Sequence, residues 1–314
     1  MSTQDIASRR IARRDLAAVG LVITWSAGFI GAEFGTQAGA APFTMLSWRF
    51  VILSAILLVT CAVSGTSLRS WQAWKRQIGL GLLCQAGYLG FVFVGIGHGV
   101  HGGTTALIAA LQPLLVMTVA GRLLGETPSR LAWSGTGLGF LGVFIVVSAD
   151  IGADHAPAWV YVFPTLAMLS LTVGTVLSKK IKPPESLLQT ITMQAALSAV
   201  VFTVVAALTG QAQVPQNTGT WMAIGWLILI PSIAGYGLYV YVTHASGATV
   251  VSTLLYLTPP TTMIWAYLMF GDPIYLAGLL GLAVSAVGVI IVLRTRRTAT
   301  TGHVARSRQA STAR

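Results

Sequence analysis

The chain has 314 residues, of which 54% are hydrophobic and only 9% are charged. An average soluble domain carries about 25% charged residues, so this composition excludes an ordinary soluble protein and indicates one embedded in a lipid bilayer. The net charge of +11 would suggest a nucleic-acid partner in a soluble chain, but here the basic residues lie between apolar segments, and we expect no such partner.

Ten apolar segments follow one another along the chain. Each has about the 20 residues that a helix needs to cross a bilayer, so each is predicted to be a transmembrane helix. The connections between them are short, which leaves no room for a soluble domain. The predicted spans are residues 16–35, 42–63, 78–97, 103–124, 131–149, 158–177, 187–208, 221–243, 248–270 and 274–293.

Lys and Arg are distributed unevenly between the two sets of connections. Of the 19 basic residues, 18 lie before span 1, after span 10, or in or beside the connections between spans 2 and 3, 4 and 5, and 6 and 7. Only Arg49 lies inside a span. Because basic residues stay on the cytoplasmic side, we predict a multi-pass protein of the cell membrane with both termini in the cytoplasm.

One sequence pattern occurs twice, 146 residues apart. Residues 111–113 (LQP) are followed by Gly and Glu at 125–126, and residues 257–259 (LTP) are followed at the same distance by Gly and Asp at 271–272. The interval contains five spans, an odd number, so the second copy would cross the membrane upside down. The sequence therefore predicts an all-α membrane protein of ten transmembrane helices in two inverted five-helix repeats, an arrangement typical of alternating-access transporters.

The repeat divides the chain into five predicted regions. The two repeats meet at the connection 150–157, and the Arg-, Thr- and Ser-rich tail is expected to be disordered. The regions are a basic cytoplasmic N-terminus (1–15), the first repeat (16–149), an outer linker (150–157), the second repeat (158–293) and a basic cytoplasmic tail (294–314).

Four segments resemble a known family. They are WSAGF at 25–29, PFTMLSWRF at 42–50, ALIAALQPLLVMTVAGRLLGETPS at 106–129 and STLLYLTPPTTMIWAYLMFGDPI at 252–274. Together they resemble the EamA type of the drug/metabolite transporter superfamily over about residues 16 to 293. The resemblance implies ten helices in two inverted repeats and the export of small metabolites, amino acids or drugs. Asp272 stands where the family usually has Glu, which keeps the charge.

Two charged residues lie within predicted spans. Arg49 is seven residues inside span 2, and Glu33 is near the outer end of span 1. A charge at the centre of a bilayer costs roughly 2.5 to 3.5 kcal/mol, so each needs a reason. One interpretation is that Arg49 and Glu33 pair for stability. The other is that one of them meets a charged group of the substrate or a coupling ion.

Polar and aromatic residues recur at helical spacing on four repeat-related spans. In span 8, Ser232, Tyr236, Tyr239 and Thr243 share one face, and Trp25, Phe29 and Glu33 share a face of span 1. Such stripes are often packing or an interfacial belt, but their recurrence in both halves favours a central cavity. The predicted substrate-binding residues are Trp25, Glu33, Arg49, Gln85, Tyr88, Phe91, Gln112, Tyr236, Tyr239, Ser252 and Tyr256.

The sequence contains no strong signal for a metal, a cofactor or catalysis. His98 and His101 have no acidic partner nearby in the sequence, so we interpret them as polar loop residues. Glu126 and Asp272 are expected to cap helices or to pair with charges. There is no P-loop motif for ATP, and we expect neither a cofactor nor a bound metal.

The sequence thus predicts a secondary transporter that exports small metabolites, plausibly amino acids or aromatic compounds, by alternating access. One alternative is a multidrug or toxic-cation exporter of the same fold, and a weaker one is an intramembrane enzyme. The expected partners are a small-molecule substrate and the lipid bilayer. Proton coupling and the oligomeric state remain open at this point.

Overall fold

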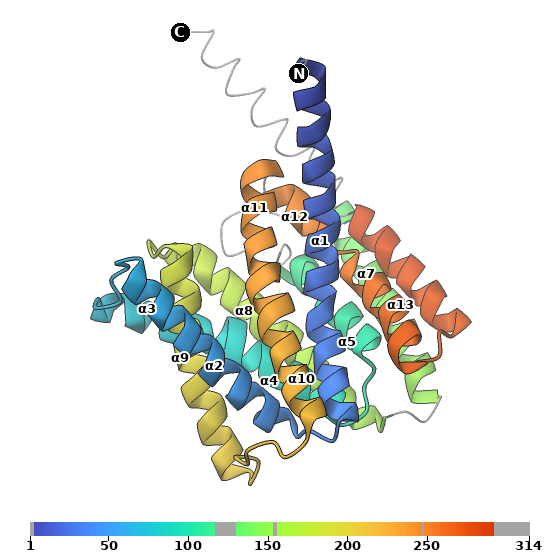
Figure 1. Cartoon of the computed structure of the whole chain (residues 1–314). Coiled ribbons are helices and arrows are strands. Elements are labelled where there is room, and N and C mark those ends of the chain that lie inside the picture. Colours follow the sequence, from blue (N-terminus) through green and yellow to red (C-terminus); the bar gives the residue numbers. More distant parts are fainter. Residues whose placement is uncertain (1–2, 117–129, 153–155, 247, 292–314) are drawn as a thin grey trace.

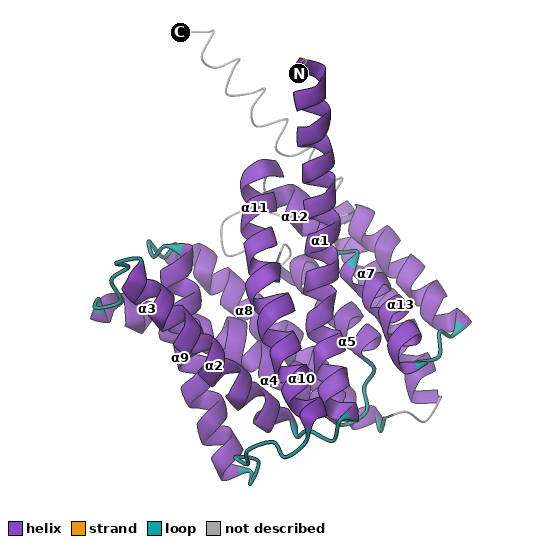
Figure 2. Ribbon diagram, viewed as in Figure 1, coloured by secondary structure: helices purple, strands orange, loops and turns teal. Residues whose placement is uncertain are grey.

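The computed structural model describes residues 3–116, 130–152, 156–246 and 248–291. Within these ranges the protein consists of helices joined by short loops, without a strand (Figure 2). Seven helical segments are long and apolar enough to cross a membrane, so the chain is a multi-pass membrane protein. They are Arg14–Gln37, Pro42–Val63, Trp71–Gly97, Trp133–Ile151, Ala158–Ile181, Leu187–Leu208 and Thr218–Ser246, with shorter apolar helices at Gly102–Val116 and Leu276–Ile291.

The helices follow the predicted spans in order. The bounds of α2 and α9 equal those predicted from the sequence. The predicted Gly-acid pair at 125–126 and the predicted tail at 294–314 lie outside the described residues. The elements are α1 (Thr3–Gln37), α2 (Pro42–Val63), α3 (Trp71–Gly81), η1 (Leu82–Gly87), α4 (Tyr88–Gly97), α5 (Gly102–Ala109), α7 (Arg130–Gly152), η2 (Ala158–Tyr161), α8 (Val162–Ile181), α9 (Leu187–Leu208), α10 (Thr218–Leu227), η3 (Ile228–Gly235), α11 (Tyr236–Ser246), α12 (Ala248–Leu255) and α13 (Thr258–Phe270).

The predicted ninth span, 248–270, is not one continuous helix. It breaks between α12 and α13, where a turn at Tyr256 and Leu257 precedes Pro259. A proline has no N–H to donate to the carbonyl four residues earlier, so the helix cannot continue unchanged through it. The same break occurs in the first half, where a turn follows α5 just before Pro113. Both breaks leave backbone carbonyls without their usual helical donors.

Two wider, π-helical turns interrupt the spans that start at Trp71 and Thr218. They are η1 and η3, which begin at Leu82 and Ile228. Proline explains η3 directly, because Pro231 lies inside it and cannot donate to Leu227. Such bulges often occur at functional sites, since they rotate the following side chains relative to a regular helix.

Helices from the two halves of the chain pack against one another (Figure 1). Helix α1 of the first half contacts α10, η3 and α11 of the second half, and α8 of the second half contacts η1 and α4 of the first. Two further contacts join the halves, that of α2 with α9 and that of α5 with α13. The helix Leu276–Ile291 approaches α7 so closely that a Cβ on Gly281 would lie 2.5 Å from the Gly142 oxygen. A Cβ on Gly288 would lie 2.5 Å from the Gly135 oxygen, so these glycines are needed for the contact.

Candidate functional site

A cavity of about 590 Å³ lies among α1, α2, the two π-helical turns, α5, α8 and α11. Its volume falls in the range of small-molecule sites, roughly 300 to 1,000 Å³. Its wall includes residues beside both proline breaks, among them Pro113 and Thr258. The interrupted helices therefore meet at the space where a ligand could bind.

Most of the residues predicted to bind substrate line this cavity. Helix α1 contributes Trp25, and the other rings come from spans that a π-helical turn or a proline interrupts. Their role in binding stays a prediction, but the structure brings them together. The predicted residues at the cavity are Trp25, Arg49, Gln85, Tyr88, Gln112, Tyr236, Tyr239 and Tyr256.

Three predicted residues are not part of this wall. The ring of Phe91 stacks on Phe163 with their centroids 6.5 Å apart, which is a packing role. Glu33 accepts a hydrogen bond from the backbone N–H of Gly102 at 3.3 Å, one turn beyond the cavity residue Phe29. The side chain of Ser252 lies outside the described part of the structure.

Arg49 is buried, with 5% of its surface exposed, and its Nη2 donates to the Ser232 hydroxyl at 3.0 Å. The interpretation in which Arg49 pairs with Glu33 is wrong. Among the described residues, Arg49 makes no ion pair with a carboxylate. The reason is tertiary, because Ser232 of η3 accepts from the guanidinium while Glu33 is bonded to the backbone of Gly102.

Aromatic rings form one side of the cavity. Trp25 stacks on Tyr239 with centroids 5.6 Å apart and an interplanar angle of 29°, and it meets Tyr236 edge-on at 6.0 Å. Rings in contact hold one another in place and present a rigid apolar surface. This surface suits a substrate with a flat or apolar body.

The sequence did not predict several polar residues of the cavity, among them Thr175, Lys179 and Gln194. Thr175 accepts a hydrogen bond from the Gln112 side chain at 3.0 Å. Lys179 had been assigned only to the basic connection after span 6. A signal for Gln194 did exist, because it is the eighth residue of the 22-residue α9, as Arg49 is the eighth residue of the 22-residue α2.

Gln194 connects the cavity to a polar network that includes Arg76 and Gln77 in the middle of α3. Its side-chain amide donates to Gln77 Oε1 at 2.9 Å, and Gln77 donates to Glu185 Oε2 at 2.9 Å. Glu185 also forms an ion pair with Arg76. Although burial opposes its charged form, the hydrogen bonds from Arg76 and Gln77 lower the pKa of Glu185. The network thus joins α3, α9 and the loop between α8 and α9.

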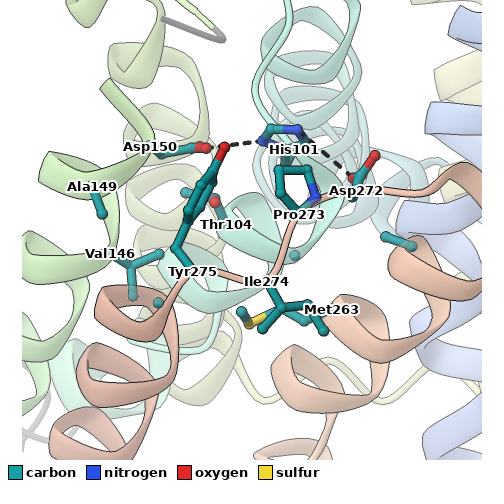
Figure 3. A pocket seen from close by; sticks show the side chains of 13 residues that line it. His101, Thr104, Val146, Ala149, Asp150, Met263, Asp272, Pro273, Ile274 and Tyr275 are labelled. Carbon is teal, nitrogen blue, oxygen red and sulfur yellow. Dashed lines mark hydrogen bonds and ion pairs between the residues drawn. The ribbon is translucent and has the colours of Figure 1, made fainter. Parts of the chain in front are cut away.

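A second polar cluster lies beyond the cavity, at the end of α1 distant from the N-terminus. His101 Nδ1 is 2.9 Å from Asp150 Oδ1, and its Nε2 is 3.9 Å from Asp272 Oδ2 (Figure 3). The expectation that His101 lacks an acidic partner is therefore wrong, because both carboxylates reach it from distant parts of the chain. Burial lowers the pKa of His101, but the hydrogen bond and charge of Asp150 and the charges of Asp272 and Glu33 outweigh it, so this pKa is raised.

These groups surround a space of about 40 Å³, enough for one water molecule rather than a metabolite. Thr104, Met263 and Tyr275 also line it (Figure 3). Within the described part of the chain, no set of three or more His, Cys, Asp or Glu side chains could hold a metal ion. The cluster therefore joins segments of the protein, and the larger cavity is the candidate binding site.

Comparison with known proteins supports a transport role. The model of the EamA-like transporter family matches residues 13–148 and 158–294. A probable amino-acid metabolite efflux pump of Salmonella typhimurium is 22% identical over 89% of this chain and 95% of its own. An uncharacterised transporter of Bacillus subtilis, YyaM, is 25% identical over 83% and 89%. A crystal structure of a protein with 20% identity has the same fold, with a TM-score of 0.62 over 91% of this chain and 99% of that one.

Proposed function

The chain belongs to the EamA-like transporter family, and we propose that it is a secondary transporter that exports small metabolites from the cytoplasm by alternating access. It is a transporter and not an enzyme. Amino acids and aromatic compounds are the first substrates to test. A relative is named as a probable amino-acid metabolite efflux pump, and aromatic rings form one side of the cavity.

Ten spans in two inverted five-helix repeats are part of this proposal, and the packing of the helices supports them. If the repeats are related by a two-fold axis in the membrane plane, each contact must have a counterpart with the halves exchanged. The contact of α1 with η3 has such a counterpart in that of α8 with η1. The contact of Gly142 with Gly281 has one in that of Gly288 with Gly135.

The proposed orientation puts both termini in the cytoplasm. It rests on the 18 basic residues that share one set of connections. A reporter inserted after Lys182 should be accessible only from the cytoplasm, and one inserted before Pro157 only from outside. Finding both on the same side would rule out the ten-span topology.

One observation carries the proposed transport function. The cavity takes its wall from both halves of the chain, with Tyr88 after η1 and Tyr236 after η3. A site at the junction of two repeats opens to one side when the repeats rock one way and to the other side when they rock back. Neither half could enclose it alone.

The test uses the purified full chain in proteoliposomes loaded with a panel of radiolabelled amino acids and aromatic metabolites. Efflux is measured with and without a pH gradient, which also decides whether protons are coupled. Tyr88→Ala and Tyr236→Ala should lower efflux at least tenfold at unchanged thermal stability. Tyr241→Ala is the matched control, since Tyr241 is exposed and does not line the cavity. Equal efflux by the wild type and all three variants would contradict the assignment of the cavity as the transport site.

A further inference from the structure

The position of Arg49 follows from a proline. Pro231 has no N–H, so it leaves the carbonyl of Leu227 without its helical donor. The Ser232 hydroxyl donates to that carbonyl at 2.8 Å. Because the Ser232 hydroxyl proton is used in this bond, the Ser232 oxygen acts as an acceptor for Arg49 Nη2 at 3.0 Å. The break in η3 thereby orients the guanidinium.

Most N–H donors of this guanidinium have no acceptor among the described residues. Nε and Nη1 of Arg49 are buried without a hydrogen bond within the described residues. A guanidinium has five N–H donors, and these two nitrogens carry three of them. The contact with the Phe50 ring, 5.1 Å from Cζ to the centroid, is favourable but supplies no acceptor. A buried charge in this state is costly until an anion pairs with it.

Among the described residues that line the cavity, the charged side chains have one sign. Arg49 and Lys179 are basic, and the described residues that line the cavity include neither Asp nor Glu. An organic cation would meet like charges here, whereas an anion would meet opposite ones.

We propose that the cavity binds an organic anion, with a carboxylate held by Arg49 and an aromatic or apolar body against Trp25 and Tyr239. This proposal rests on the proposed transport function and names the substrate class. Hydrogen bonds between a guanidinium and a carboxylate are charge-assisted and about twice as strong as neutral ones. The planar fork of Arg matches a carboxylate in a way that Lys does not. The same arrangement disfavours the toxic-cation exporter considered from the sequence.

Three probes of one shape and different charge test this site: phenylacetate, phenylacetamide and phenethylammonium. Their binding to the purified full chain in detergent is measured by calorimetry. We expect phenylacetate to bind at least tenfold more tightly than the other two. Tighter binding of phenethylammonium, equal binding of all three, or no binding of phenylacetate would overturn the anion site.

Substitutions localise the effect to Arg49. Arg49→Gln should weaken phenylacetate binding about tenfold or more and change phenylacetamide binding less than about threefold, since a charged hydrogen bond contributes roughly 1.5 to 3 kcal/mol. Arg49→Lys should retain part of the preference. Lys75→Gln is the control because Lys75 packs on Trp71 outside the cavity. An equal loss of phenylacetate affinity in Lys75→Gln would mean that overall charge causes the effect, which would contradict the proposal.

Two further measurements keep the outcomes separate. If Arg49→Gln does not fold, as judged by thermal unfolding, Ser232→Ala replaces it. Ser232→Ala keeps the charge of Arg49 but removes the hydroxyl that orients its guanidinium. We expect it to lower the affinity for phenylacetate several-fold. Efflux of neutral or cationic compounds that does not depend on Arg49 would overturn the anion site and leave the exporter. Binding of phenylacetate without efflux of any compound would overturn the exporter and leave the site.

Discussion

Helices α2 and α9 have the same length and the same place in the two halves, yet their eighth residues differ in chemistry. Both Arg49 and Gln194 line the cavity. Arg49 is charged and keeps donors without partners, whereas the amide of Gln194 is bonded to Gln77 and through it to Glu185. The same position therefore offers a charge to the cavity in one half and a neutral group tied to a polar network in the other.

The residues four positions before the two cavity tyrosines Tyr236 and Tyr88 differ in the same sense. Ser232 precedes Tyr236 by four residues, and Cys84 precedes Tyr88 by four residues. A hydroxyl is a good acceptor for a guanidinium, but a thiol is a weak one. The comparison teaches that packing is repeated in both halves, whereas the polar chemistry that could bind a ligand is asymmetric.

The largest expected effect comes from exchanging the two residues. Arg49→Gln should lower efflux of the transported anion at least tenfold, and Arg49→Gln combined with Gln194→Arg should not restore it. At position 194 the guanidinium would face Gln77 and would lack the acceptor that Ser232 provides. Efflux from proteoliposomes measures both proteins. Full recovery in the double variant would mean that the two positions are equivalent and the asymmetry has no function.

The polar network should matter for stability. Gln77 is 1% exposed, and Gln77→Leu would leave Glu185 Oε2 and the Gln194 amide without their partners. Buried polar groups that lose a partner cost about 1 to 3 kcal/mol each. We expect a lower midpoint of thermal unfolding in detergent. Gln216→Leu is the control, because Gln216 is exposed and bonds only to the nearby Val214 carbonyl. Equal midpoints in the two variants would contradict a structural role for the network.

The smallest expected effect is on the pH dependence of stability. It comes from His101, which pairs with Asp150 and Asp272 outside the cavity. The pKa of His101 is raised above 6.5, so the charged ring stabilises the folded state fully below about pH 6.5. This stabilisation is lost as the pH rises through the folded-state value. We expect the midpoint of thermal unfolding to be higher in the wild type than in His101→Gln at about pH 5. This difference in midpoint should become smaller as the pH rises to about 9. His98→Gln serves as the control, since His98 contacts Val94 and not the carboxylates. A difference in midpoint that grew with increasing pH would contradict a stabilising role for the charged form of His101.

Local sequence predicted several features well. The bounds of α2 and α9 follow from uninterrupted apolar runs between polar connections, and length and composition suffice to locate such helices. Helical spacing also predicted that Tyr236 and Tyr239 share a surface, and both line the cavity. The same spacing was a poorer guide for Phe91, because its ring stacks on Phe163 of α8 instead of lining the cavity with Tyr88.

The length and composition of the apolar segments and the repeated spacing of Pro and Gly are enough to predict a multi-pass helical membrane protein with two related halves, because they can be read along the chain without knowing how the helices pack. The contact of Arg49 with Ser232 instead of Glu33, and those of His101 with Asp150 and Asp272, follow only from the packing of the helices. These pairs are far apart in the chain, and they form where helices from different segments cross. Which side chains face each other at a crossing depends on helix rotation, and the π-helical turns and proline breaks change that rotation by amounts that sequence periodicity does not encode.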